Sequence, residues 1–184
     1  MIIAMTGLPG TGKSTLAKAL SQALPALILD KDVVRAALFP AGEIEYSTHQ
    51  DDFVIQVMLQ VADFYVRKDA TRHILLDGRP FSKQSQVDTL VAYGRQHGWD
   101  LRFIHCVCSD DVARARIERD AAAGQHLAAN RDFNLYLRLK AQADPLQVPH
   151  LGLDTGRPLP ACIQDCLGYL SQPSENLKVE NERP

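Results

Sequence analysis

Residues 7–14 of the chain read Gly7-Leu8-Pro9-Gly10-Thr11-Gly12-Lys13-Ser14, and they match the pattern G-x-x-x-x-G-K-[ST] at every fixed position. A short apolar run, residues 2–5, precedes this loop, and apolar residues recur at helical spacing after it. The pattern requires this strand–loop–helix context, because the glycines let backbone N–H groups surround a phosphate and the helix N-terminus adds a favourable dipole. We expect Lys13 to reach the outer phosphates and the Ser14 hydroxyl to ligate Mg²⁺. A glycine-rich turn with a chance lysine would not explain that context.

The composition is that of one ordinary globular domain. The chain has 184 residues, of which 46% are hydrophobic and 23% are charged, and its formal net charge is -2. Extended binding along a nucleic acid usually needs a basic excess, so this balance leaves room only for a local basic patch. We find neither a secretory signal nor an apolar run near the ~20 residues of a membrane-spanning helix, and we therefore expect a cytoplasmic protein without membrane contact.

The four cysteines fall in two pairs, and each pair shares a face of one predicted element. They are Cys106 with Cys108, and Cys162 with Cys166. A four-thiolate zinc site is conceivable, but these spacings are not the usual ones for zinc. We interpret the cysteines as small buried hydrophobic residues in a reducing compartment.

Short apolar runs alternate with helical patterns along the chain, which predicts an α/β fold with a parallel sheet. We expect strands at residues 2–5, 26–29, 74–76, 101–107 and 151–153, each apolar enough to be buried on both faces. We expect helices from the loop to about residue 24, and at about 48–72, 82–98, 109–124, 133–143 and 160–170. The apolar stripe predicted on the helix at 48–72 consists of Phe53, Val57, Val61, Phe64 and Tyr65.

Acidic residues follow three of the predicted strands, at the edge where an open parallel sheet binds its ligands. Asp30 and Asp32 follow the second strand, Asp77 the third and Asp154 the fifth. We expect Asp77 to hold Mg²⁺ or its waters beside the loop serine, with a capping or salt-bridge role as the alternative. A carboxylate at Asp32 would accept the proton of an attacking hydroxyl, but Asp30 or Asp32 would equally well cap the following helix, and the residues alone leave both roles open.

Three segments together resemble small P-loop kinases. They are the loop extended to Thr15, then Leu29-Asp30-Lys31-Asp32-Val33-Val34-Arg35, then Ile74-Leu75-Leu76-Asp77. Over about residues 1–170 the chain is similar to the polynucleotide-kinase-like and chloramphenicol-phosphotransferase-like groups of the AAA-type P-loop NTPases. The resemblance implies a three-layer α/β fold, with a five-stranded parallel sheet flanked by helices and a small helical lid. We accordingly expect a kinase domain at residues 1–171, with its lid at about 112–131, and a flexible polar tail at 172–184.

The resemblance also implies roles for particular residues. In polynucleotide 5′-hydroxyl kinases, an aspartate after the second strand is the general base and an arginine three residues later contacts the acceptor. These positions correspond to Asp32 and Arg35. In related kinases the loop before the last helix packs on the adenine, which implies that the backbone near Thr155 and Gly156 lies close to the base.

Such kinases also have a lid whose arginines stabilise the transferring phosphoryl group, which implies that role for Arg116 or Arg119. The alternative is a solvated surface pairing with Glu118 and Asp120. The chief further candidates for the acceptor pocket are Tyr46, Arg79 and Arg131. Arg79 comes after Asp77 and Gly78 at the end of the third predicted strand, and Arg131 lies after the predicted lid loop. Less specific candidates are Glu43, His49, Asn130 and Asp132.

Together these features predict an ATP- and Mg²⁺-dependent kinase that transfers the γ-phosphoryl group to a hydroxyl of a small molecule, acting as a monomer or homodimer. A polynucleotide 5′-hydroxyl kinase is the first alternative, and the net charge favours the small acceptor over it. A nucleotide-binding switch or regulatory ATPase without a small acceptor is the second. An adenylylsulfate kinase or another nucleotide kinase is the third.

Overall fold

A computed structural model describes residues 1–123 and 132–173 of the chain. Five parallel strands form one sheet in the order β2-β3-β1-β4-β5. The strands are β1 (Ile2–Thr6), β2 (Ala26–Asp30), β3 (His73–Asp77), β4 (Leu101–Val107) and β5 (Leu151–Asp154). All five predicted strands are therefore confirmed, and every strand except β4 runs slightly further than predicted.

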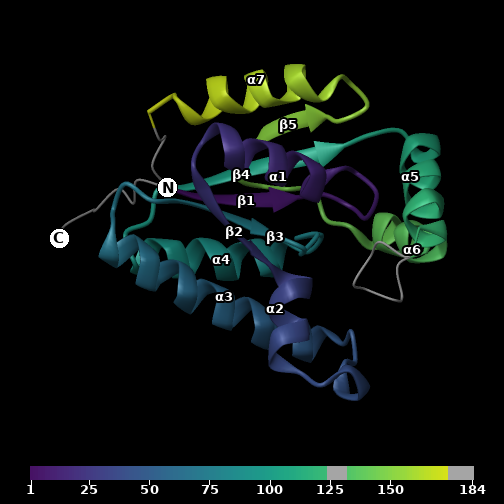
Figure 1. Ribbon diagram of the computed structural model, residues 1–184, viewed down its shortest axis with the longest axis horizontal. Helices are drawn as coiled ribbons and strands as arrows, with labels where there is room; N and C mark the ends of the chain where they lie inside the picture. Colours follow the sequence, from purple (N-terminus) through teal and green to yellow (C-terminus); the bar gives the residue numbers. More distant parts are fainter. Residues whose placement is uncertain (124–131, 174–184) are drawn as a thin grey trace.

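Helices cover both faces of the sheet, which confirms the predicted three-layer α/β fold (Figure 1). On one face lie α1 (Lys13–Ala23) and α7 (Leu159–Leu170), and on the other lie α3 (Thr48–Lys68) and α4 (Gln84–Gln96). Two further helices, α5 (Asp110–Ala122) and α6 (Phe133–Gln142), lie beyond the carboxyl ends of the strands (Figure 1). The short α2 (Lys31–Leu38) and a 3-10 turn (Ala41–Glu43) connect β2 to α3.

The alternation of side chains along β1 divides the core in two. Ile2 and Ala4 pack with the α3 and α4 side chains, whereas Ile3 and Met5 pack with those of α1 and α7. All four of these side chains are fully buried. A central parallel strand needs apolar residues on both of its faces for this reason, and the uninterrupted apolar run before the loop supplies them.

The prediction for α3 was wrong in its length and only partly right in its buried face. The helix ends at Lys68, four residues before the predicted end, and Phe53 and Phe64 are 49% and 62% exposed. Val61 and Tyr65 of the predicted stripe do pack against the core, but the buried side chains of this helix are Val54, Ile55, Met58, Leu59 and Ala62. Apolar residues surround most of this helix, so its periodicity is compatible with more than one face, and docking on the sheet decides between them.

The cysteines are all free, and Cys106, Cys162 and Cys166 are buried in the core, while Cys108 is half-buried. Within residues 1–123 and 132–173, no group of His, Cys, Asp or Glu side chains is arranged to hold a metal ion without further ligands. Their burial confirms the interpretation as apolar core residues for Cys106, Cys162 and Cys166. No helix in the described part of the chain is long and apolar enough to cross a membrane.

Candidate active site

The loop at residues 7–14 connects β1 to α1 and leaves the first turn of α1 open to a ligand. The N-cap of α1 is Gly12, at φ 81°, and no side chain caps its backbone N–H groups. Lys13 lies over the loop, where its Nζ donates to the carbonyl oxygen of Leu8 at 2.8 Å. Uncapped amides at a helix N-terminus beside a buried lysine form an anion-binding site.

Gly7 is required at its position by both space and backbone conformation. Its φ is 125°, and a Cβ atom there would lie 2.2 Å from the carbonyl oxygen of Cys106 on β4. The loop therefore packs directly against the neighbouring strand, which a larger residue would prevent. The second half of the loop is held from the other side, because the Thr155 hydroxyl donates to the carbonyl oxygen of Thr11 at 2.8 Å.

A cleft of about 840 Å³ extends from this loop along the carboxyl ends of β2 and β3 towards α2, α3, α5 and α6. It brings together most of the predicted site residues. Those that line it are Pro9, Gly10, Gly12, Lys13, Ser14, Thr15, Asp32, Arg35, Tyr46, Arg79, Arg116, Arg119 and Thr155. Gly7, Leu8, Thr11, Asp77 and Gly156 are not among the lining residues, and neither are the exposed Glu43 and His49. Asn130 and Arg131 lie outside the described residues, as does the end of the predicted lid.

Asp30 is the residue that caps α2. Its Oδ1 accepts hydrogen bonds from the backbone N–H groups of Asp32 at 2.8 Å and Val33 at 3.3 Å. Asp32 therefore has no capping role, and its carboxylate lies on the first turn of α2 in the wall of the cleft. Burial raises the pKa of Asp30, and the neighbouring Asp77 raises it further. The two aspartates are register partners on β2 and β3.

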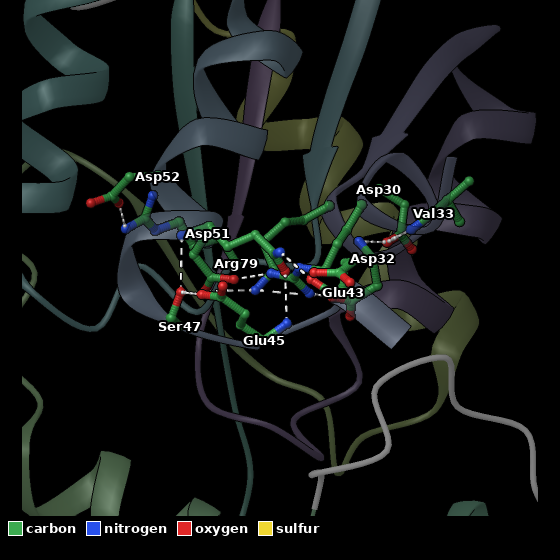
Figure 2. Close-up of polar contacts among 12 residues, drawn as sticks. Asp30, Asp32, Val33, Glu43, Glu45, Ser47, Asp51, Asp52 and Arg79 are labelled. Carbon is green, nitrogen blue, oxygen red and sulfur yellow. Dashed lines mark hydrogen bonds and ion pairs between the residues drawn. The ribbon is translucent and has the colours of Figure 1, made fainter. Parts of the chain in front are cut away.

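Four side chains around Asp32 form a closed set of charges, which we call the charge ring: Asp32, Arg35, Asp51 and Lys31. The Arg35 Nη1 donates to Asp32 Oδ1 at 2.7 Å, and its Nη2 donates to Asp51 Oδ1. The Lys31 Nζ donates to Asp51 Oδ2 at 2.9 Å and lies 4.0 Å from Asp32 Oδ1. Figure 2 labels Asp32 on α2 and Asp51 on α3 among the polar contacts of this region. Each carboxylate is thus shared between two cations.

The cations of the charge ring are the more deeply buried members. The side chain of Arg35 is 2% exposed and that of Lys31 is 8% exposed. Burial lowers the pKa of Lys31 to about 8, and nearby Arg35 and Arg79 contribute to the decrease. Buried charges of this kind persist only where opposite charges and hydrogen bonds compensate for lost water. Asp51 provides that compensation for both cations at once.

Two further groups complete this side of the cleft. Arg79, directly after the β3 turn, forms an ion pair with Asp52 on α3 (Figure 2). Tyr46 has a φ of 51°, and the Arg35 guanidinium lies 5.2 Å from the centre of its ring. The conformation of this segment is maintained by Gln50, whose side chain donates to the carbonyl oxygen of Glu43 and accepts from the N–H of Glu45.

Asp77 and Ser14 provide the kind of ligands that Mg²⁺ prefers. Asp77 is 2% exposed, and its Oδ1 has no hydrogen-bond partner within the described part of the chain. Ser14 lines the cleft at the start of α1. An ion held mainly by phosphate oxygens and water needs only one or two such protein ligands, so these residues fit a phosphate-bound Mg²⁺.

The two candidate lid arginines lie in different surroundings. Arg116 is engaged at the base of the loop, where its guanidinium donates to the Thr155 hydroxyl at 3.0 Å and to the Thr155 carbonyl oxygen at 2.8 Å. Arg119 is 72% exposed, and its only described ion pair is with Asp120 at 3.2 Å. The two arginines line the same cleft, but only Arg119 has a guanidinium free of buried contacts.

Sequence reasoning missed three residues of the site, Lys31, Asp51 and Asp52. Lys31 lies between Asp30 and Asp32, and the pattern there pointed to the two carboxylates and gave no role to the lysine. Asp51 lies in the first turn of α3, where acidic residues are ordinary helix-dipole partners, and Asp52 follows it directly. No local pattern distinguishes them, although an arginine at residue 35 that is buried in the fold would need a carboxylate from elsewhere in the chain.

A five-stranded parallel sheet with this loop after its central strand defines a P-loop NTPase with a kinase fold. The AAA domain family model matches residues 2–144, and the chain therefore belongs to that family. No curated protein sequence matches the chain.

Solved structures of kinases share the fold. An inferred kinase from Chloroflexus aurantiacus is 23% identical, with a TM-score of 0.71, over 91% of this chain and 96% of that chain. The APS kinase CysC of Mycobacterium tuberculosis, in complex with AMPPNP and APS, is 20% identical, with a TM-score of 0.69, over 93% and 97%. A gluconokinase from Sinorhizobium meliloti is 17% identical, with a TM-score of 0.66, over 91% and 90%. The predicted P-loop kinase fold is confirmed, while the narrower resemblance to polynucleotide and chloramphenicol kinases stays a prediction.

Proposed function

We propose that the protein is an ATP-dependent phosphotransferase that moves the γ-phosphoryl group of ATP to a hydroxyl of a small molecule. The observation that carries this proposal is the position of Asp32. Its carboxylate lines the same cleft as Lys13 and Ser14, and Asp30 performs the capping that would otherwise account for it. A carboxylate that lies in the cleft, is held there by Arg35 and is not used as the helix cap is placed to accept a proton.

The loop would bind the phosphoryl donor, ATP. Its amides and Lys13 would hold the β- and γ-phosphates, and Ser14 and Asp77 would hold Mg²⁺, which supplies charge neutralisation on the phosphate oxygens. Thr155, tied to the loop through Thr11, would bring the β5–α7 connection close to the base. We assign Arg116 to maintaining this junction, because both of its terminal nitrogens bond Thr155.

Asp32 and its neighbours would bind and activate the acceptor. The acceptor oxygen attacks the γ-phosphorus, the bond to the β–γ bridging oxygen breaks, and the hydroxyl proton passes to Asp32. Arg35 holds the carboxylate in place through the 2.7 Å hydrogen bond, with Tyr46 and Arg79 beside the acceptor. Arg119 would turn from Asp120 to the equatorial oxygens, where negative charge spreads in the transition state.

The test is a panel of hydroxyl compounds incubated with ATP and Mg²⁺, with ADP release as the readout. We expect release to depend on the compound, and we expect Lys13→Ala to abolish it and to weaken ATP binding. Turnover by Lys13→Ala at the wild-type rate would refute the assignment. The alternatives give different results: release that ignores every hydroxyl compound indicates a regulatory ATPase, and activity on nucleic-acid 5′ ends that falls steeply with salt indicates a polynucleotide kinase.

A further inference from the structure

The two halves of the cleft differ in the balance of their charges. Lining residues from the loop, α1, α5 and the β5–α7 connection include one carboxylate, Asp120, and five cations, Lys13, Lys18, Arg116, Arg119 and Arg157. Lining residues from β2, α2, α3 and the segment after β3 include three cations, Lys31, Arg35 and Arg79, and three carboxylates, Asp30, Asp32 and Asp51. The excess of positive charge therefore lies where a triphosphate would bind, and the other half is balanced.

Every cation of the balanced half already has a carboxylate partner. Lys31 bonds Asp51 at 2.9 Å, Arg35 bonds both Asp32 and Asp51, and Arg79 bonds Asp52. An anionic group that approached Arg35 would therefore also approach Asp32 and Asp51. Like charges brought together in a partly desolvated site oppose binding strongly.

Displacement of these carboxylates would not solve that problem. Asp51 is 24% exposed and accepts with both oxygens, so an anion that took over Arg35 would leave a mostly buried carboxylate short of a partner. Leaving one member of a buried ion pair uncompensated is costly. The carboxylates of the charge ring thus already pair with the cations that an anionic acceptor would need.

Neutral hydroxyl groups meet no such opposition. A hydroxyl donates one hydrogen bond and accepts others, so it can bond a carboxylate and a guanidinium in the same site without breaking the pair. Apolar surface is also available for a carbon skeleton, from Val33, Tyr46 and Pro80 in the lining.

We propose, resting on the function proposed above, that the acceptor is an uncharged hydroxyl compound that carries no phosphate, sulfate or carboxylate group. The charge ring excludes anionic relatives of the acceptor and keeps Asp32 available to its hydroxyl. A polynucleotide 5′ end, which brings a phosphate one nucleotide away, is disfavoured for the same reason.

The first arm of the test compares matched pairs as acceptors: glucose with gluconate, glycerol with glycerate, and adenosine with adenosine 3′-phosphate. We expect the neutral member of any productive pair to have a kcat/KM about tenfold or more above that of its anionic partner. An anionic member that equals or exceeds its neutral partner would overturn the proposal. If no compound is phosphorylated, the function proposed above is what fails, and the second arm still decides the charge preference.

The second arm needs no turnover. The donor half is filled with AMPPNP and Mg²⁺, and sulfate is titrated calorimetrically at constant ionic strength. We expect no saturable binding to the wild-type complex, and one saturable site in Asp51→Asn, because that change frees Lys31 and Arg35 from a shared partner. Saturable sulfate binding by the wild-type complex that Arg35→Gln abolishes would overturn the proposal.

Discussion

Exchange of Asp32 for asparagine removes the proposed proton acceptor with almost no change in shape. We expect kcat to fall by about 10²–10⁴-fold, the range for loss of a general acid–base group, with the Kd for AMPPNP unchanged. The fold should survive, because Arg35 keeps its bond to Asp51 and loses only a single charge-assisted partner. A cost of about 1 kcal/mol, and hence a Tm lower by about 2–4 °C, is expected.

Asp30→Asn is the matched control, made two residues away with the same chemical change. Asparagine caps a helix as well as aspartate does, so the bonds to the N–H groups of Asp32 and Val33 can be kept. Burial and Asp77 both raise the pKa of Asp30, which means that its carboxylate is disfavoured in the folded state. Replacement by a neutral amide should therefore leave stability unchanged or slightly higher, with most of kcat retained.

Steady-state kinetics, calorimetric titration of AMPPNP and thermal unfolding of both variants complete the comparison. The reasoning predicts a large loss of kcat confined to Asp32→Asn. Equal losses in both variants would refute it, as would an Asp32→Asn enzyme that retains kcat within about tenfold of the wild type. Loss of AMPPNP binding in Asp32→Asn would instead point to a role for Asp32 in metal or nucleotide binding.

Three more predictions follow from particular contacts. Arg119→Ala should lower kcat with little change in Tm, whereas Arg116→Ala should lower Tm and nucleotide affinity, since only Arg116 ties α5 to Thr155; kinetics and thermal unfolding of the pair check this. Lys31 has a folded-state pKa of about 8 against an ordinary value of 10.5, so the unfolded chain binds more protons than the folded chain between these pH values. The free energy of unfolding of the wild type, relative to that of Lys31→Met, should therefore rise as the pH increases from 8 to 10.5, and denaturant titrations of both proteins measure it. Gly7→Ala should cost ~3 kcal/mol or more, because its Cβ would meet a backbone carbonyl 2.2 Å away at a φ of 125°, and a variant with a wild-type denaturation midpoint would contradict the loop geometry.

Local patterns were sufficient to predict the donor half of the site. The loop, the strand before it and the helix after it form one continuous segment, and Asp77 is the last residue of its strand. The edge at which strands end is common to all parallel strands, so the acids after β2 and β3 had to come together. The register confirms that they do, since Asp30 and Asp77 are partners.

The acceptor half depends on contacts that no local pattern records. Arg35 pairs with Asp51 only because α3 docks beside α2, and the face that α3 presents to the core was predicted only in part. The division of roles between Asp30 and Asp32 also needed coordinates, because either side chain has the chemistry of a cap. Hydrogen-bond geometry, rather than residue type, separates the capping aspartate from the one in the cleft.

Detection of a phosphate ester on the acceptor tests the central claim most directly. The protein is incubated with ATP, Mg²⁺ and each hydroxyl compound, and the compounds are examined by mass spectrometry beside a Lys13→Ala reaction. We predict that one class of compound gains a phosphoryl group with the wild type and stays unmodified with Lys13→Ala. Wild-type protein that hydrolyses ATP to free phosphate at the same rate with every compound, and esterifies none of them, would contradict the account.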